Sequence, residues 1–271
     1  MRYTIGASHD IAMVLVSRGM INTLTIFAAI LAFSIAAMGG EFYELRSYQL
    51  NSPEKAAAFD KMMAAAIPVL TKSGVTHVGV FRGRDAKASD PNWRYVLSAA
   101  GSLDTLARER GTFASDEAFL EQSRAYLSYE KSDPAFARIS VATFAAFKGF
   151  TKLIKPAADA GGERFFELRI YESHSEYTAF MKVRMFDEAE LDIFADVGLR
   201  GVFFGSALSG DNLPNLTYML VYDNEAEKKK AWATFLKAPA WQALKGEEIY
   251  KDTVSKITSR FLVATAYSTI R

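Results

Sequence analysis

The chain of 271 residues has no cysteine, which excludes disulfides, thiolate metal sites and cysteine nucleophiles. It has three histidines, His9, His77 and His174, and their spacing fits neither a zinc site nor a two-histidine iron site. A single axial histidine for haem stays open, although no residue pattern selects it. We therefore predict no metal site and no tightly held cofactor.

An excess of charge of either sign is also missing. Leaving out the first forty residues leaves 30 basic and 30 acidic side chains, a net charge of zero. This balance argues against a nucleic-acid partner and against attraction to a membrane surface by charge. No glycine-rich phosphate loop follows an expected strand, and residues 205–210 (GSALSG) lack the G-x-S-x-G pattern of a serine nucleophile.

Charged residues are absent from Leu24–Gly39, a sixteen-residue run that follows Arg18 and ends in small residues. This pattern is typical of a secretory signal peptide, so we expect a periplasmic or secreted protein. The alternative is a membrane anchor formed by residues 21–39, although sixteen residues are short for a span of about 20. We assign residues 1–40 to this leader and expect no membrane contact once it is removed.

What the chain does contain is a seven-residue stretch that occurs twice. Residues 42–48 read FYELRSY and residues 165–171 read FFELRIY, with five of seven positions identical and an offset of 123 residues. Each copy is a strand candidate, in which successive side chains point to opposite sides. A duplicated strand at this distance predicts two copies of one fold.

The two faces of the duplicated strand differ in chemistry. In the second copy, Phe166, Leu168 and Ile170 form an apolar face, which we expect to pack on helices. The other face carries an aromatic, an acid, a base and an aromatic, and we expect it to look into the space between two sheets: Phe42, Glu44, Arg46 and Tyr48 in the first copy, Phe165, Glu167, Arg169 and Tyr171 in the second. Each acid–base pair is either a structural ion pair or part of a ligand site.

The same element order follows each copy of the strand. After the first, Ser52, Pro53 and Glu54 predict the start of a helix that stops at Gly74. The rest of the first unit, residues 41–147, is then expected as strands at 75–81 and 93–97, a helical region at 103–129 broken near Gly111, and a strand at 137–147. Residues 148–163 form a linker, and residues 164–271 repeat the order, with Tyr218 at the place of Tyr95.

This order predicts an α+β fold of two tandem ferredoxin-like β-α-β-β-α-β repeats. A four-stranded sheet with helices on one side leaves its other face uncovered, so two copies can bury those faces against each other. We expect the repeats to pack sheet-to-sheet as an α/β barrel within one chain.

Several motifs resemble the NIPSNAP family. They are the Glu-Leu-Arg-x-Tyr strand, the helix end at residues 67–70 (IPVL) before Gly74, and the pair Trp232-x-x-Phe235 and Pro239-x-Trp241. The resemblance covers residues 41–271 as two family units and implies the dimeric α/β-barrel group. Relatives of that fold include cofactor-independent monooxygenases, haem-binding proteins and small isomerases, which is an analogy at the level of the fold.

Three functions are compatible with these observations. The first is binding of a small apolar or aromatic ligand in the barrel interior, through Glu44, Arg46, Tyr48, His77, Glu167, Arg169 and Tyr171. The second is a monooxygenase or isomerase in which His77 and a carboxylate such as Glu44 act as acid and base. The third is a protein-interaction scaffold with a filled interior, and assembly into a homo-oligomer fits all three. A cavity of at least about 300 Å³ touching His77 would favour the first two.

Overall fold

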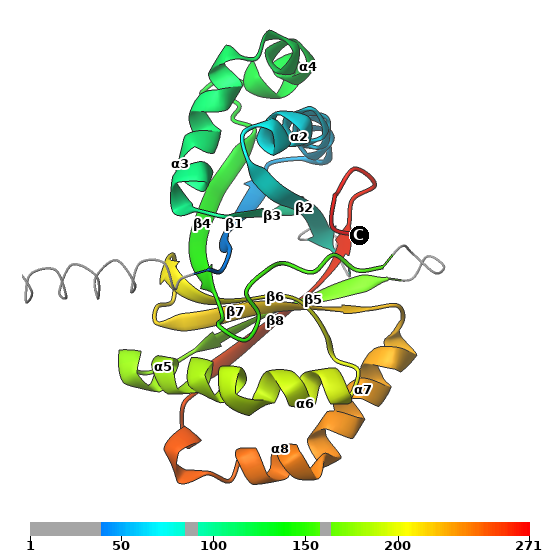
Figure 1. The fold of residues 1–271 in the computed structure, drawn as a ribbon. Helices are drawn as coiled ribbons and strands as arrows, with labels where there is room; N and C mark the ends of the chain where they lie inside the picture. Colours follow the sequence, from blue (N-terminus) through cyan, green and yellow to red (C-terminus); the bar gives the residue numbers. More distant parts are fainter. Residues whose placement is uncertain (1–38, 85–91, 158–163) are drawn as a thin grey trace, which may run out of the picture. The chain divides into compact units, whose positions relative to one another are not determined.

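The structure is a computed structural model that describes residues 39–84, 92–157 and 164–271 (Figure 1). Residues 40–271 form one compact unit. The predicted signal peptide or anchor lies outside the described residues, apart from its last two positions. Within the part of the chain that the structure describes, no helix is long and apolar enough to cross a membrane.

The first unit begins with β1 (Phe42–Leu50) and α2 (Pro53–Lys72). The Ser52 side chain caps α2 by accepting a hydrogen bond from the Lys55 backbone N–H at 3.2 Å. The helix is followed by Gly74, whose φ of 101° is a left-handed conformation that glycine adopts without a steric cost. The remaining elements are β2 (Val75–Gly83), β3 (Trp93–Ala100), α3 (Leu103–Thr112), α4 (Glu117–Leu127) and β4 (Phe136–Ala146).

The predicted break in the second helical region is confirmed. A 3-10 turn at Phe113–Ser115 separates α3 from α4. The residue that caps α4 is Asp116, whose side chain accepts a hydrogen bond from the Phe119 N–H at 2.8 Å.

The second unit repeats this order. Its long helical region ends before Gly198 and contains a π-helical turn at Phe186–Glu190 between two α-helices. The elements are β5 (Phe165–Glu172), α5 (Glu176–Met185), α6 (Leu191–Asp196), β6 (Arg200–Ser209), β7 (Asn215–Tyr222), α7 (Glu225–Lys237), α8 (Pro239–Leu244) and β8 (Lys256–Ala264).

The eight strands close into one barrel in the order β1-β3-β2-β8-β5-β7-β6-β4. Within each unit the strands pair antiparallel over most of their length, whereas the two seams between units are shorter. One seam joins Phe81–Gly83 to Leu262–Ala264, and the other joins Thr143–Ala146 to Gly205–Ser209. In Figure 1, α2, α3 and α4 cover one side of the barrel and the helices of the second unit cover the other. The predicted intrachain barrel of ferredoxin-like repeats is confirmed.

The predicted direction of the strand faces is wrong. Tyr43, Leu45, Phe166 and Leu168 belong to one apolar cluster that draws on both units and fills the barrel interior. The aromatic and charged face instead meets the helices: Tyr48 packs with Phe59 and other α2 residues, and Phe165 and Tyr171 pack with residues of the second unit's helices. The interior takes the face without charges because a closed barrel excludes water from both sheets at once, and buried charge is costly.

The predicted match between Tyr95 and Tyr218 is also wrong, by one residue. Tyr218 pairs with Arg169 of β5 and faces the helices. Tyr95 pairs with Ser47 of β1 and belongs to the interior cluster, while the residue opposite Arg46 is Val96. Since side chains alternate along a strand, a shift of one position exchanges the two faces.

Candidate functional site

The centre of the barrel is packed with large side chains and offers no room for a ligand. The interior cluster contains the fully buried rings of Tyr43, Phe81, Phe144, Phe166 and Phe203. Phe81 and Phe166, which come from different units, meet edge to face with ring centroids 5.0 Å apart. The predicted ligand site in the middle of the barrel is therefore not formed, and open space lies at its ends.

Three of the predicted site residues meet in a polar network between the second sheet and its helices. Arg169 donates hydrogen bonds to Glu167 at 2.5 Å, to Ser259 at 3.1 Å and to the Tyr171 hydroxyl at 3.1 Å. Its guanidinium also lies over the Trp232 ring, 4.6 Å from the centroid. Glu167 and Arg169 are thus a shielded ion pair, with side-chain exposures of only 2% and 15%.

Two further tyrosines complete this network. The Tyr222 hydroxyl donates to Glu167 at 2.8 Å and accepts from the Trp232 indole N–H at 2.8 Å. The Tyr218 hydroxyl donates to that of Tyr171 at 2.9 Å. Burial, and then the charge of Glu167, raise the pKa of Tyr222, so its proton stays in place as a donor. The network pairs its buried acid and base with each other and leaves only the Nε–H of Arg169 without a hydrogen-bond partner, which indicates a structural role.

The first unit keeps the ion pair in different surroundings. Arg46 forms a salt bridge with Glu44 on β1. The positions opposite Phe42 and Arg46 on β3 are Ala100 and Val96, where the second unit has Tyr222 and Tyr218 opposite Phe165 and Arg169. The two units are therefore not chemically equivalent.

His77 lies on β2 opposite Ala99, a residue of the interior cluster. The half-buried imidazole has its pKa lowered by burial; the charge of Glu41 acts in the opposite direction, and that of Lys155 adds to the lowering. His77 is therefore mainly neutral near pH 7. The nearby carboxylate is Glu41, which accepts hydrogen bonds from the Leu153 N–H at 2.7 Å and from the Thr76 hydroxyl at 2.9 Å.

The expected pair between His77 and Glu44 is not formed. Glu44 lies between Tyr43 and Leu45 on β1, and these two neighbours face the interior. The Glu44 side chain consequently points to the opposite side of the sheet from His77. An acid–base pair of these two residues is excluded by the alternation of the strand.

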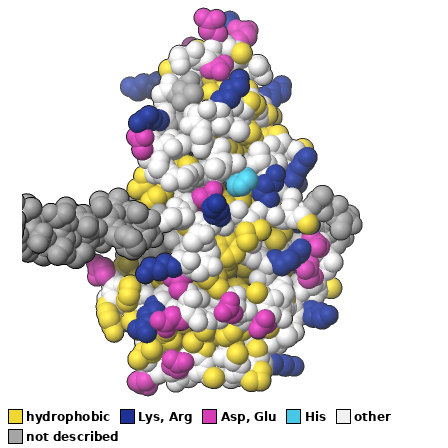
Figure 2. Space-filling model, viewed as in Figure 1, with side chains coloured by type: hydrophobic (Ala, Val, Ile, Leu, Met, Phe, Trp, Pro, Cys, Tyr) yellow, Lys and Arg dark blue, Asp and Glu magenta, His cyan; other side chains and the backbone are white. Residues whose placement is uncertain are grey.

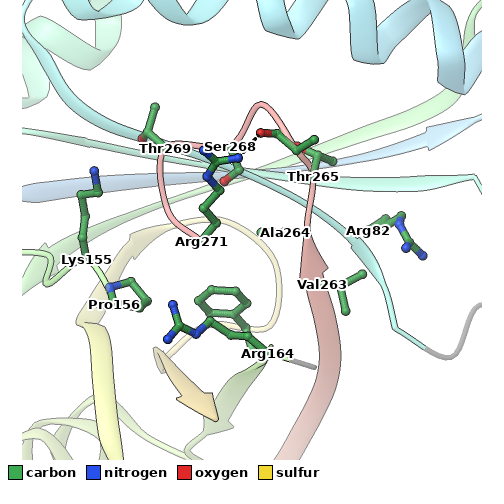
Figure 3. Close-up of a pocket in the computed structure, with 12 residues that line it drawn as sticks. Arg82, Lys155, Pro156, Arg164, Val263, Ala264, Thr265, Ser268, Thr269 and Arg271 are labelled. Atoms are coloured by element: carbon green, nitrogen blue, oxygen red, sulfur yellow. Dashed lines mark hydrogen bonds between the residues drawn. The ribbon is translucent and has the colours of Figure 1, made fainter. Parts of the chain in front are cut away.

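A basic cavity of about 920 Å³ lies open at one end of the barrel (Figure 3). Four cationic side chains from four separate segments line it: Arg82 of β2, Lys155 after β4, Arg164 before β5 and Arg271 after β8. Hydroxyls of Thr265, Ser268 and Thr269 and the apolar side chains of Phe166 and Val263 complete the wall. None of the described residues that line it is acidic, so the cavity favours an anion.

The cations of this basic cavity differ in whether other groups of the protein already bind them. Arg164 is tied to Asp223, with two hydrogen bonds at 2.8 and 2.9 Å, and Arg271 donates to the Ala266 carbonyl at 2.6 Å. Among the residues that the structure describes, neither Arg82 nor Lys155 has an ion-pair partner. These two side chains are the ones most able to meet an incoming negative charge.

A second hollow borders the basic cavity on the outside of the second unit. This apolar groove has a volume of about 430 Å³ and shares Lys155 and Pro156 with the cavity. It lies where the chain between β4 and β5 crosses α6 and β6, and Figure 2 shows hydrophobic side chains gathered on this face of the molecule. At the other end of the barrel, a smaller pocket of about 170 Å³ reaches Trp93, Tyr95 and Arg260.

Sequence reasoning did not select the residues of the basic cavity. Arg82, Lys155, Arg164 and Arg271 share no motif, and only barrel closure brings their segments to one place. One signal was present: Arg164 directly precedes the duplicated strand, and the opening of a barrel is where strands begin and end. None of the predicted site residues lines the cavity.

Residues 166–269 match the model of the NIPSNAP family. Two similar solved structures span both units. A proposed monooxygenase from Lactobacillus acidophilus is 13% identical, with a TM-score of 0.53 and coverage of 83% of this chain and 94% of that one. A proposed monooxygenase from Fusobacterium nucleatum is 10% identical, with a TM-score of 0.51 and coverage of 83% and 93%.

Single-unit structures are also similar to the chain. A NIPSNAP family protein from Agrobacterium tumefaciens is 17% identical, with a TM-score of 0.37, and it covers 40% of this chain and 100% of its own. No curated protein sequence matches the chain. At these identities the solved structures establish the fold alone.

Proposed function

We propose that the two-unit barrel, whose residues 166–269 match the model of the NIPSNAP family, binds a small organic acid in the basic cavity. One observation carries this proposal. Four cations from separate segments converge on about 920 Å³ of open space, with no acidic side chain among the described residues of its wall. This volume is in the range of small-molecule sites.

The wall supports an organic anion over an inorganic one. The cations offer charge-assisted hydrogen bonds to a carboxylate, while the ring of Phe166 and the side chain of Val263 offer apolar contact beside them. Two of the apolar lining residues, Phe166 and Ala264, also belong to or pack against the interior cluster. A ligand with an acid group and a carbon skeleton fits both parts.

The test compares small acids with an uncharged analogue. We expect succinate and butanoate to bind in an NMR titration, with succinate the tighter because it carries two charges, and butanamide to bind much more weakly. Arg82→Ala is expected to weaken succinate binding about tenfold, since a hydrogen bond to a charged group contributes about 1.5 kcal/mol or more.

Arg138→Ala is the matched control, because Arg138 is also an exposed arginine on a strand but does not line the basic cavity. The control should bind succinate as the unaltered protein does. Equal weakening by both substitutions would point to non-specific attraction by surface charge and would count against the site. So would the absence of binding by either acid.

Two other expectations stay predictions. Export depends on residues 1–40, which lie outside the described part except for the last two. Assembly into a homo-oligomer is the second of these predictions. In this chain, however, the barrel closes without a partner, so an oligomer is not needed to complete the sheet.

A further inference from the structure

The apolar groove beside the basic cavity has an aromatic floor. The rings of Phe150, Phe194 and Phe204 line it, and the Phe150 and Phe204 rings meet edge to face at 4.9 Å. Gly201 makes this packing possible, since a Cβ atom there would lie 3.2 Å from the Phe150 ring and closer still to that of Phe204. Ile154, with 55% of its surface exposed, forms part of the rim.

A short segment of chain forms the border between groove and basic cavity. Lys155 and Pro156 line both, and the residues directly before them are fixed in place. The N–H of Ile154 donates to the Val202 carbonyl at 2.9 Å, and Leu153 is buried in the interior cluster. A ligand that reaches from one hollow to the other therefore passes a fixed border that carries a positive charge.

The two hollows differ in chemistry in a way that one molecule can satisfy. The basic cavity has four cations, whereas most of the groove wall is apolar: Phe150, Ile154, Pro156, Ala157, Leu191, Phe194, Ala195, Leu199, Phe204 and Val221. The groove's other cation, Arg200, is already paired with Asp223 and Glu227, each at 3.0 Å. The charge that remains for a ligand is on the side of the cavity.

We infer that the ligand is an amphiphilic acid, such as a fatty acid, whose carboxylate lies on the cations of the basic cavity and whose apolar chain lies in the groove. This inference rests on the proposed function and specifies its ligand class. Lys155 is the residue at which the two parts of the ligand meet. A short acid without an apolar chain occupies only the cavity. An apolar chain without an acid group lacks the contacts with the cations.

The experiment measures the dissociation constants of butanoate, octanoate and dodecanoate by calorimetry, below the concentrations at which they form micelles. We expect affinity to rise along the series, with at most about a fourfold gain for each added methylene group. Dodecanol is the uncharged comparison and should bind at least tenfold more weakly than dodecanoate.

Ala195→Trp tests the groove directly. Ala195 is exposed on α6 and lines the groove but not the basic cavity, so an indole there takes up the space of the chain. This variant should bind dodecanoate no more tightly than butanoate, and its affinity for butanoate should equal that of the unaltered protein. Ala243→Trp, at an exposed alanine of α8 that lines neither hollow, is the matched control. It should keep the full rise in affinity from butanoate to dodecanoate.

The outcomes separate this inference from the proposed function. Equal affinity for all three acids, or an Ala195→Trp variant that keeps the gain with chain length, overturns the amphiphilic ligand and leaves acid binding in place. Dodecanol binding as tightly as dodecanoate also overturns it, because the cations then contribute nothing. If none of the acids binds, the proposed function fails and the inference with it.

Discussion

At the scale of single residues, the same ion pair has acquired different surroundings in the two units. Glu167 is held by Arg169 and by the Tyr222 hydroxyl, and Tyr222 is fixed in turn by Trp232. Such a network keeps buried charge stable only while every partner is present. The duplicated strand therefore serves to anchor the sheet to its helices in the second unit.

Replacing Glu167 by alanine should destabilise the fold by about 3 kcal/mol, because it leaves Arg169 shielded without its counter-charge. The measurement is urea-induced unfolding followed by circular dichroism. Glu248→Ala is the control: Glu248 pairs with Lys251 on the surface, with 86% of its side chain exposed, and should change stability by less than about 0.5 kcal/mol. A Glu167→Ala variant as stable as the unaltered protein would show that the network does not hold the sheet.

At the scale of elements, the segment after β8 completes the edge of β2. Strand β8 pairs with β2 only at Phe81–Gly83, and the following residues run beside the rest of the strand. The Val78 N–H donates to the Thr269 hydroxyl at 3.0 Å, and the Val80 N–H donates to the Ser268 hydroxyl at 3.1 Å. In return, the Thr265 and Thr269 backbone N–H groups donate to the Val80 and Val78 carbonyls at 2.9 and 3.0 Å, and the same segment forms a wall of the basic cavity.

Ile270 fixes this segment in the barrel, because its side chain is fully buried in the interior cluster. Ile270→Ala should lower the free energy of unfolding by about 2 to 5 kcal/mol through the cavity that it leaves. Denaturant unfolding measures the loss. Ile257→Ala, at an isoleucine with 50% exposure on β8, should cost far less; an equal loss in both variants would mean that the segment is not anchored by Ile270.

At the scale of the whole molecule, the barrel depends on both units. Each sheet turns an apolar face inward, and the interior cluster takes side chains from both sheets. Neither face can be exposed to water without a large cost, since each bears several bulky apolar side chains. Joining two units in one chain provides the partner for each sheet at all protein concentrations.

The second unit expressed alone, residues 164–271, should consequently form a homodimer or aggregate rather than a monomer. Size-exclusion chromatography with light scattering gives the mass, and the chain of residues 40–271 is the control, for which the closed barrel predicts no need for a partner. A stable monomer of the isolated unit would contradict the view that its inner face requires cover.

The sequence by itself determined the local structure and the number of units. The period of the apolar residues, the cap at Ser52 and the stop at Gly74 are local signals, and the helices and strands form where these signals place them. The duplicated strand indicated two copies of one fold, and the uncovered face of each sheet indicated closure. These features follow from interactions between residues that are near in the chain or from a pattern that repeats along it.

Only the tertiary structure decided which face of the duplicated strand lies inside, and where a ligand has room. Period-two alternation separates Glu167 from Leu168 but does not say which side meets the helices, because either face can be buried. The uncharged face points into the barrel interior, and the ion pairs lie on the face that meets the helices. The cations of the basic cavity come together only when distant segments meet at the barrel end, so no local pattern could have selected them.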